Sequence, residues 1–168
     1  MTDDFCSEIR RKYPQFYSKM VGYSDDEIEK IEKLYGVEVT GQLRQFLRCA
    51  GRSAGGLVGD DTITLYRNAW TVRSHVALGF RLINDLQDIS AWEYISNPFP
   101  FSIIGETQYY YVRTGSKSHN KDIVYHYNED ESSVESTNMT LFDFLRRIIN
   151  AQGVDENRIV CRGELLIL

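Results

Sequence analysis

The sequence contains no long apolar run and no excess of basic residues. Its N-terminal segment starts with acidic residues and reaches no apolar core of the kind that a secretory signal needs, and no later stretch approaches the length of a membrane span. Lys and Arg number 19 against 24 Asp and Glu, a formal net charge of -5, whereas a nucleic-acid surface normally requires a basic face. We therefore expect a cytoplasmic protein that contacts neither membranes nor nucleic acid directly, and whose charge favours a basic partner.

Cysteine is scarce, and its spacing suggests no pairing. The three residues, Cys6, Cys49 and Cys161, are widely separated and form no CxxC pair, so the sequence offers neither a disulfide framework nor the usual thiolate metal motif. We expect reduced thiols with structural roles. Cys49 stands beside Ala50, close to the inward stripe of an expected helix, which favours a packed thiol over a nucleophile.

A complete catalytic or metal-binding motif is also missing. The three histidines occur in different settings, with His75 in an expected helix, His119 in a turn and His126 in a strand, and none has the HExxH spacing. His126 precedes an acidic turn, so the alternative to a surface histidine is a metal-dependent enzyme that uses it with Asp60 and Asp61. We expect no enzyme activity, no metal and no cofactor.

The glycine-rich segment 51–61 lacks the features of a phosphate-binding loop. A P-loop ends in GK[ST] and leads into a helix, and a dinucleotide fingerprint follows a strand. Here the order is helix, glycines, the acidic pair Asp60 and Asp61, and then an expected strand. Because these carboxylates would repel phosphate, we interpret the segment as a structural turn.

What the chain does contain is an ordinary globular composition. Of its 168 residues, 42% are hydrophobic and 12% are aromatic, which is enough apolar surface for one core without disulfides or metal. The sequence has no internal repeats, low-complexity tracts or linkers. Residues 1–168 are therefore expected to form a single domain.

Helix signals recur along the chain. Ser24 and Glu27 form a capping-box pair, and Gly36 follows the apolar stripe, so a helix is expected between them. A second helix is expected from Thr40 to Gly51. The others are a short helix and turn within residues 3–20, a long helix over 71–88 with Val72, Val76, Phe80, Ile83 and Leu86 or Gln87 along one side, and a last helix capped by Thr140.

Short runs rich in β-branched and aromatic residues predict strands. They cover residues 62–66, 101–104, 109–113, 123–127 and 134–136, with turns over 115–120 and 128–133. The apolar tail after Arg158 is expected to form a final strand or to lie against the sheet. The pattern predicts an α+β fold with a single central, largely antiparallel sheet and helices packed against it.

Two groups of residues are candidates for binding a partner. Alternate strand residues face opposite ways, so Tyr110 must point away from Tyr109 and Tyr111, and at least one sheet face presents tyrosine to solvent, a helix or a partner. Core packing is the favoured reading of the tyrosines, and an interface anchor is the alternative. An acidic group could steer a basic partner; its members are Asp60, Asp61, Glu106, Glu129, Asp130 and Glu131.

Several segments resemble the SUKH superfamily, which unites a fungal cell-wall assembly regulator with many bacterial immunity proteins. They are the acidic helix and its turn over 22–36, the helix over 43–51, the segments 100–105 and 124–127, and the closing helix at 141–145. The similarity covers about residues 22 to 150. It departs from the pattern where Val39 and Thr40 replace the usual Leu-Pro, and where an acidic pair follows the glycine loop.

The resemblance implies an α+β fold and an immunity protein that binds and neutralises a cognate polymorphic or contact-dependent toxin domain by occluding its active site or substrate path. Toxins countered by this superfamily are often nucleases, whose basic surfaces would suit an acidic inhibitor. The alternative function is a non-catalytic signalling or scaffold adaptor, as the eukaryotic branch suggests.

Overall fold

The structure is a computed structural model that describes residues 4–115 and 120–168. Its elements are α1 (Phe5–Lys12), α2 (Pro14–Tyr17), β1 (Met20–Val21), α3 (Asp25–Tyr35), α4 (Gly41–Ala50), β2 (Ser53–Ala54), the 3-10 helices η1 (Thr64–Tyr66) and η2 (Trp92–Tyr94), α5 (Val72–Asp88), β3 (Pro98–Ile104), β4 (Gln108–Arg113), β5 (Ile123–Asn128), β6 (Ser133–Thr140) and α6 (Leu141–Gln152). His119 and most of the expected turn over 115–120 lie outside the described residues.

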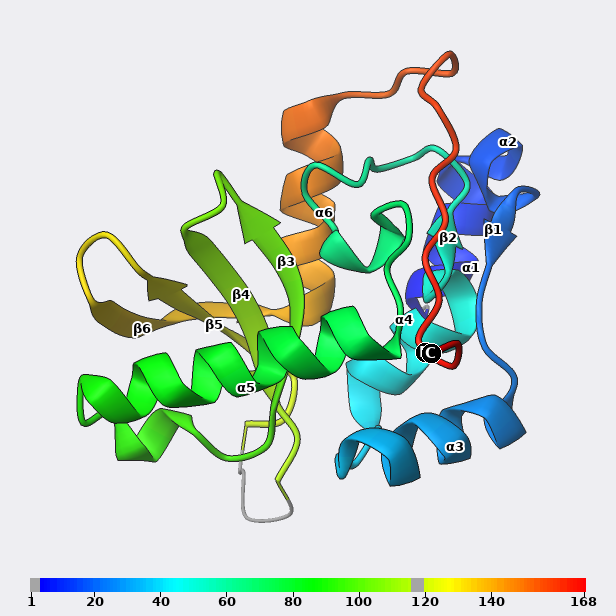
Figure 1. Ribbon diagram of the computed structural model, residues 1–168. Coiled ribbons are helices and arrows are strands. Elements are labelled where there is room, and N and C mark those ends of the chain that lie inside the picture. Colours follow the sequence, from blue (N-terminus) through cyan, green and yellow to red (C-terminus); the bar gives the residue numbers. More distant parts are fainter. Residues whose placement is uncertain (1–3, 116–119) are drawn as a thin grey trace.

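The antiparallel meander is confirmed as a four-stranded sheet in the order β3-β4-β5-β6. Tyr109 and Tyr111 of β4 pair with Tyr127 and Tyr125 of β5. One apolar cluster joins these tyrosines to Leu78, Leu82 and Leu86 of α5, and a second joins the other sheet face to α1, α4 and α6. The sheet therefore lies between α5 on one side and α1, α4 and α6 on the other (Figure 1).

The prediction of a single sheet is wrong, because β1 and β2 form a separate two-stranded sheet. Met20 pairs with Ala54 and Val21 with Ser53. The backbone leaves β1 at Gly22, where an added Cβ would lie 1.8 Å from the Arg48 carbonyl oxygen of α4. Only glycine allows this approach, which brings β1 beside the start of the glycine-rich segment.

The helix signals at α3 and α4 are confirmed, with one difference in capping. Ser24 and Glu27 form the reciprocal capping box, and Gly36 ends α3 in the left-handed conformation. At α4, however, Thr40 makes no side-chain capping bond. Instead, the backbone N–H of Gln42 donates to Asp122 Oδ1 at 2.8 Å, so a carboxylate distant in the sequence occupies the helix N-terminus.

The apolar side expected for the helix over 71–88 is only partly the buried side of α5. Phe80 is 64% exposed, whereas His75, Leu78 and Leu82 are buried with Val72 and Leu86. Both stripes have helical spacing, and the sheet selects the one that meets Tyr109 and Tyr111. The other stripe borders an open groove beside α3.

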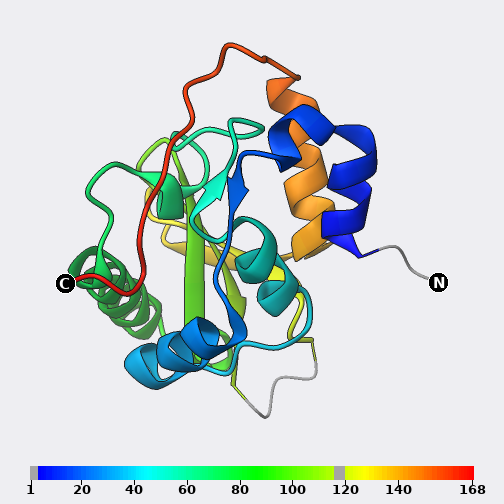
Figure 2. The same ribbon diagram turned by 90° about the vertical axis from the view of Figure 1, so that its right-hand side faces the viewer.

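Two further strand predictions are wrong. In the expected strand 62–66, only Ile63 bridges to β3, at Ser102, and the chain then tightens into η1, where Tyr66 donates from its hydroxyl to the Ala50 carbonyl at 2.6 Å. The C-terminal tail forms no strand. Leu165 is fully buried, but the tail runs from the end of α6 past β1 and β2 towards α5 rather than onto the four-stranded sheet (Figure 2).

The expectation of three separate thiols is also corrected. The sulfur atoms of Cys6 in α1 and Cys49 in α4 are paired, with 5.9 Å between the Cα atoms. Cys161 is unpaired and partly buried. In residues 4–115 and 120–168, no helix has the length and apolarity needed to span a bilayer.

Candidate acidic binding surface

The two hairpin turns at one end of the four-stranded sheet bring the predicted acidic residues together. Glu106 lies between β3 and β4, and residues 129–132 lie between β5 and β6, so both turns occupy the same end of an antiparallel meander. The Glu129 N–H donates to the Thr107 carbonyl at 2.9 Å, and the Thr107 hydroxyl donates to Asp130 at 2.9 Å. These bonds fix one turn against the other.

Arg67 connects this end of the sheet with the loop that carries Asp60 and Asp61. Its guanidinium contacts Glu106 Oε1 at 2.8 Å, and its Nε donates to the Asp60 carbonyl oxygen at 3.5 Å. These contacts place the turns that carry Glu106, Glu129 and Asp130 beside the loop that carries Asp60 and Asp61. We call Asp60, Asp61, Glu106, Glu129, Asp130 and Glu131 the acidic rim.

Glu129 is the best-anchored carboxylate of the acidic rim. Arg81 of α5 donates to both of its oxygens, at 2.7 and 2.8 Å, and the Tyr109 hydroxyl donates to Oε2 at 2.9 Å. Burial, together with the hydrogen bond to Glu129, raises the pKa of Tyr109 to about 12. The phenol therefore stays protonated and remains a donor at neutral pH.

The acidic rim keeps a strong negative charge despite these contacts. Arg67 and Arg81 offset two of its six carboxylates, and Asp61, Glu106, Asp130 and Glu131 are exposed. The rim thus holds most of the formal net charge of -5. Its chemistry suits a basic surface rather than an anion.

Tyr109 and Tyr111 belong to the core and not to an exposed surface. They are 2% and 0% exposed, and the Tyr111 hydroxyl donates to the Tyr94 carbonyl at 3.2 Å. Packing was the favoured reading of these residues, and their burial makes the alternative of interface anchors wrong. Tyr110, on the opposite face, stacks on His126 with ring centroids 4.7 Å apart.

His126 faces a groove on the α6 side of the sheet and does not contact Asp60 or Asp61. The groove has a volume of about 400 Å³ and includes Tyr110, Glu135 and Arg147. The nearest carboxylate is Glu135, 3.7 Å from His126 Nδ1. In the part of the chain that the structure describes, no three His, Cys, Asp or Glu side chains gather in a way that could hold a metal ion.

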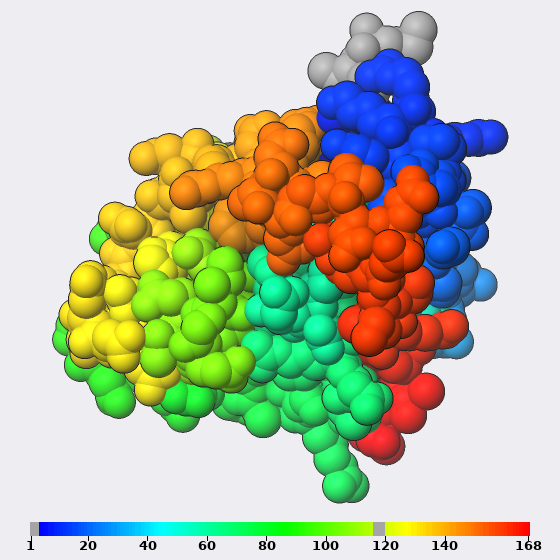
Figure 3. All heavy atoms as spheres, turned by 90° about the horizontal axis from the view of Figure 1, so that it is seen from above, coloured from blue at the N-terminus to red at the C-terminus, as the bar shows by residue number. Residues whose placement is uncertain are grey.

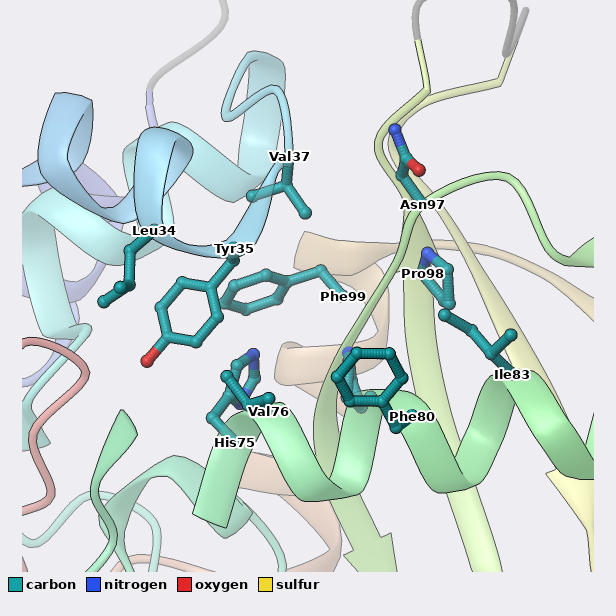
Figure 4. A pocket seen from close by; sticks show the side chains of 12 residues that line it. Leu34, Tyr35, Val37, His75, Val76, Phe80, Ile83, Asn97, Pro98 and Phe99 are labelled. Carbon is teal, nitrogen blue, oxygen red and sulfur yellow. The ribbon is translucent and has the colours of Figure 1, made fainter. Parts of the chain in front are cut away.

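A second groove lies between α3, α5 and the start of β3, and is mainly apolar (Figure 4). It has a volume of about 230 Å³, with Leu34 and Phe80 among its lining residues. His75 points towards Tyr35 and Phe99, with ring centroids 4.8 and 4.7 Å away. Burial lowers the pKa of His75 to about 3, so the imidazole is neutral and packs as an aromatic ring.

Sequence reasoning missed Arg67 and Arg81, which pair with Glu106 and Glu129 of the acidic rim. Arg81 follows Phe80 on a helix whose buried face differs from the apolar side expected, and Arg67 follows the segment expected to be a strand. No spacing rule connects either arginine with a carboxylate about 40 residues later. The register of the meander and the position of α5 create both contacts.

These features define an α+β domain with a four-stranded meander, flanking helices and an acidic end. Residues 25–145 match the family model SUKH_6, described as SMI1-KNR4 cell-wall. The chain belongs to this family, within a superfamily that includes toxin-immunity proteins. Comparisons with curated proteins and with solved structures gave no significant match.

Proposed function

We propose that the protein is a cytoplasmic immunity protein that binds a cognate toxin domain and blocks its active site or substrate path. The observation that carries this proposal is the acidic rim on a member of this family. The proposed partner is a basic toxin domain, with a nuclease as the class best suited by charge, because nuclease surfaces attract phosphate. Binding requires no reaction by this chain.

The acidic rim would act first during encounter. Exposed carboxylates attract a basic surface over a distance of roughly 10 Å at moderate salt. The carboxylates of Glu106 and Glu129 are held by ion pairs before the partner arrives, and Arg67 also holds the backbone of Asp60. A preordered charged surface loses little side-chain entropy on binding, which supports tight inhibition.

The direct experiment uses the C-terminal domain of the protein encoded immediately upstream. The purified chain should bind that domain in isothermal titration calorimetry, and coexpression should restore growth of cells that produce it. A catalytically inactive form of the domain provides the binding partner when the active form kills the host. Absence of both binding and protection would overturn the immunity proposal.

An adaptor that binds a regulatory protein is the second candidate, favoured by the cell-wall wording of the matched family description. The two functions differ in what the partner does after binding. Inhibition of the partner's enzymatic activity at stoichiometric concentration supports immunity. A stable complex in which the partner keeps full activity supports the adaptor.

A further inference from the structure

The tail after α6 is fixed at both ends. Near its start, the Arg158 guanidinium donates to the carbonyl oxygens of Gly56 and Leu57 at 3.1 and 2.6 Å. Near its end, the Leu165 N–H donates to the Tyr23 hydroxyl at 2.9 Å and its carbonyl accepts from the Tyr35 hydroxyl at 2.7 Å. The residues between these points are therefore held in place without a helix or strand.

This fixed segment presents apolar side chains to solvent. Within it, Ile159 is 80% exposed and Val160 is 47% exposed, and Val154, which precedes the Arg158 anchor, is 51% exposed. We call these three residues the apolar strip. Large aliphatic side chains that are exposed on an ordered segment lose little entropy when a partner covers them, and their burial contributes binding energy.

The apolar strip lies next to the loop that carries Asp60 and Asp61. A Cβ added to Gly56 would lie 3.2 Å from the Arg158 carbonyl oxygen and 3.5 Å from Val160 Cγ2. Burial is the main cause that raises the pKa of the neighbouring Cys161 thiol, and the charges of Asp60 and Asp61 raise it further. Viewed from above, the tail, the loop near residue 60 and the two sheet turns lie on one face (Figure 3).

The charge around the apolar strip is negative. Asp155 and Glu156 lie within the tail and are exposed, and they add to Asp60 and Asp61. Arg158 is directed into backbone carbonyls, which leaves Arg162 as the exposed cation of this segment. An apolar patch bordered by carboxylates is complementary to a basic protein surface with an apolar group at its centre.

We propose that Val154, Ile159 and Val160 form the apolar anchor by which the acidic face binds a basic protein domain. The inference rests on the proposed function and adds the position of its anchor. The segment lies outside residues 25–145, the part that matches the family model. The tail therefore adds a contact outside the domain that the family shares, and this contact makes the chain specific for its own partner.

The test is to replace two adjacent residues of the apolar strip, with Ile159→Ser and Val160→Ser in the full chain. The probe is the inactive C-terminal domain encoded immediately upstream, and binding is followed by surface plasmon resonance at several salt concentrations. We expect the double variant to raise Kd about 10-fold to 100-fold. The increase should appear in the dissociation rate, with the salt dependence of association unchanged, because no charge is altered.

The matched control is Trp92→Ser, an equally exposed apolar residue on η2, which should change Kd less than about twofold. Ile159→Leu preserves apolar area and should retain binding. Wild-type binding that the double variant does not weaken overturns the anchor and leaves the proposed function standing. Failure of the wild-type chain to bind overturns the proposed function and the anchor together.

Discussion

At the scale of single residues, Arg52 joins three separate segments. Its guanidinium contacts Glu27 of α3 at 2.8 Å and Glu164 of the tail at 2.7 Å, and it lies 3.9 Å from the centre of the Tyr23 ring. The hydrogen bond from Arg52 is the main cause that lowers the pKa of Glu27 to about 2. The arginine therefore fastens the tail, and with it the apolar strip, to the N-terminal half.

Arg52→Met should lower the free energy of unfolding by about 2 kcal/mol, because two partly buried carboxylates lose their cation. Since the folded pKa of Glu27 is depressed from 4.5, its contribution is present above pH 4.5 and is lost as the pH falls towards 2. Urea denaturation at pH 7 and pH 3 should show a smaller difference between wild type and variant at pH 3. Arg44→Met breaks a more exposed pair with Asp25 and should cost less than about 0.5 kcal/mol.

His75 gives a second residue-level prediction, which concerns the dependence of stability on pH. Burial depresses its pKa from 6.5 to about 3, so the unfolded chain binds a proton that the folded chain refuses. The free energy of unfolding should fall by up to about 1.4 kcal/mol per pH unit as the pH drops from 6.5 towards 3.

His75→Phe should remove this part of the pH dependence and fold normally, because the imidazole already packs as a ring against Tyr35 and Phe99. The measurement is the denaturation midpoint of both proteins between pH 7 and pH 4. Carboxylates titrate in both proteins, so the difference between the two pH profiles isolates the contribution of His75. Parallel pH profiles would show that the pKa of His75 is the same in the folded and the unfolded protein, which contradicts the lowering by burial.

At the scale of elements, the sequence predicted a helix where residues near its two ends in the chain satisfy its end groups. The capping box at Ser24 and Glu27 and the left-handed Gly36 identify α3 because they satisfy its end groups within a few residues. The two-stranded sheet had no such signal. Met20–Val21 and Ser53–Ala54 are too short for a periodic pattern, and their pairing depends on the packing of β1 against α4.

The surroundings of two glycines, Gly22 beside α4 and Gly79 on α5, predict opposite effects when each is replaced by alanine. Gly22→Ala should destabilise the protein by at least about 3 kcal/mol, because its Cβ would overlap the Arg48 carbonyl oxygen at 1.8 Å. Gly79→Ala lies on α5 with no neighbour within 4 Å and should stabilise it by about 0.5 to 1 kcal/mol. Thermal unfolding followed by circular dichroism distinguishes them; a tolerated Gly22→Ala would contradict the close approach.

At the scale of the whole molecule, the acidic rim was predictable as a group of residues but not as a surface. The sequence named its six carboxylates, whereas the contacts of Glu106 and Glu129 depend on Arg67 and Arg81, which reach them across the fold. The tyrosine pair illustrates the reverse case. Strand alternation correctly separated Tyr109 and Tyr111 from Tyr110, but only the position of α5 decides that this pair is buried.

The last prediction concerns electrostatic attraction by this surface. Asp61→Asn, Asp130→Asn and Glu131→Gln remove three exposed charges while preserving side-chain shape. The association rate with the proposed basic partner should fall about tenfold at low salt, and the rates of wild type and variant should converge as salt screens the remaining charges. Stopped-flow fluorescence at increasing ionic strength measures both effects.

A charge-matched control separates attraction by the acidic rim from the effect of net charge. Asp26→Asn, Glu29→Gln and Glu93→Gln remove three exposed carboxylates from α3 and η2. Because exposed charges act over roughly 10 Å at 0.1 M salt, this variant should associate within about twofold of the wild-type rate. Equal slowing of both triple variants would mean that the total charge attracts the partner and that the acidic rim has no special position in the encounter.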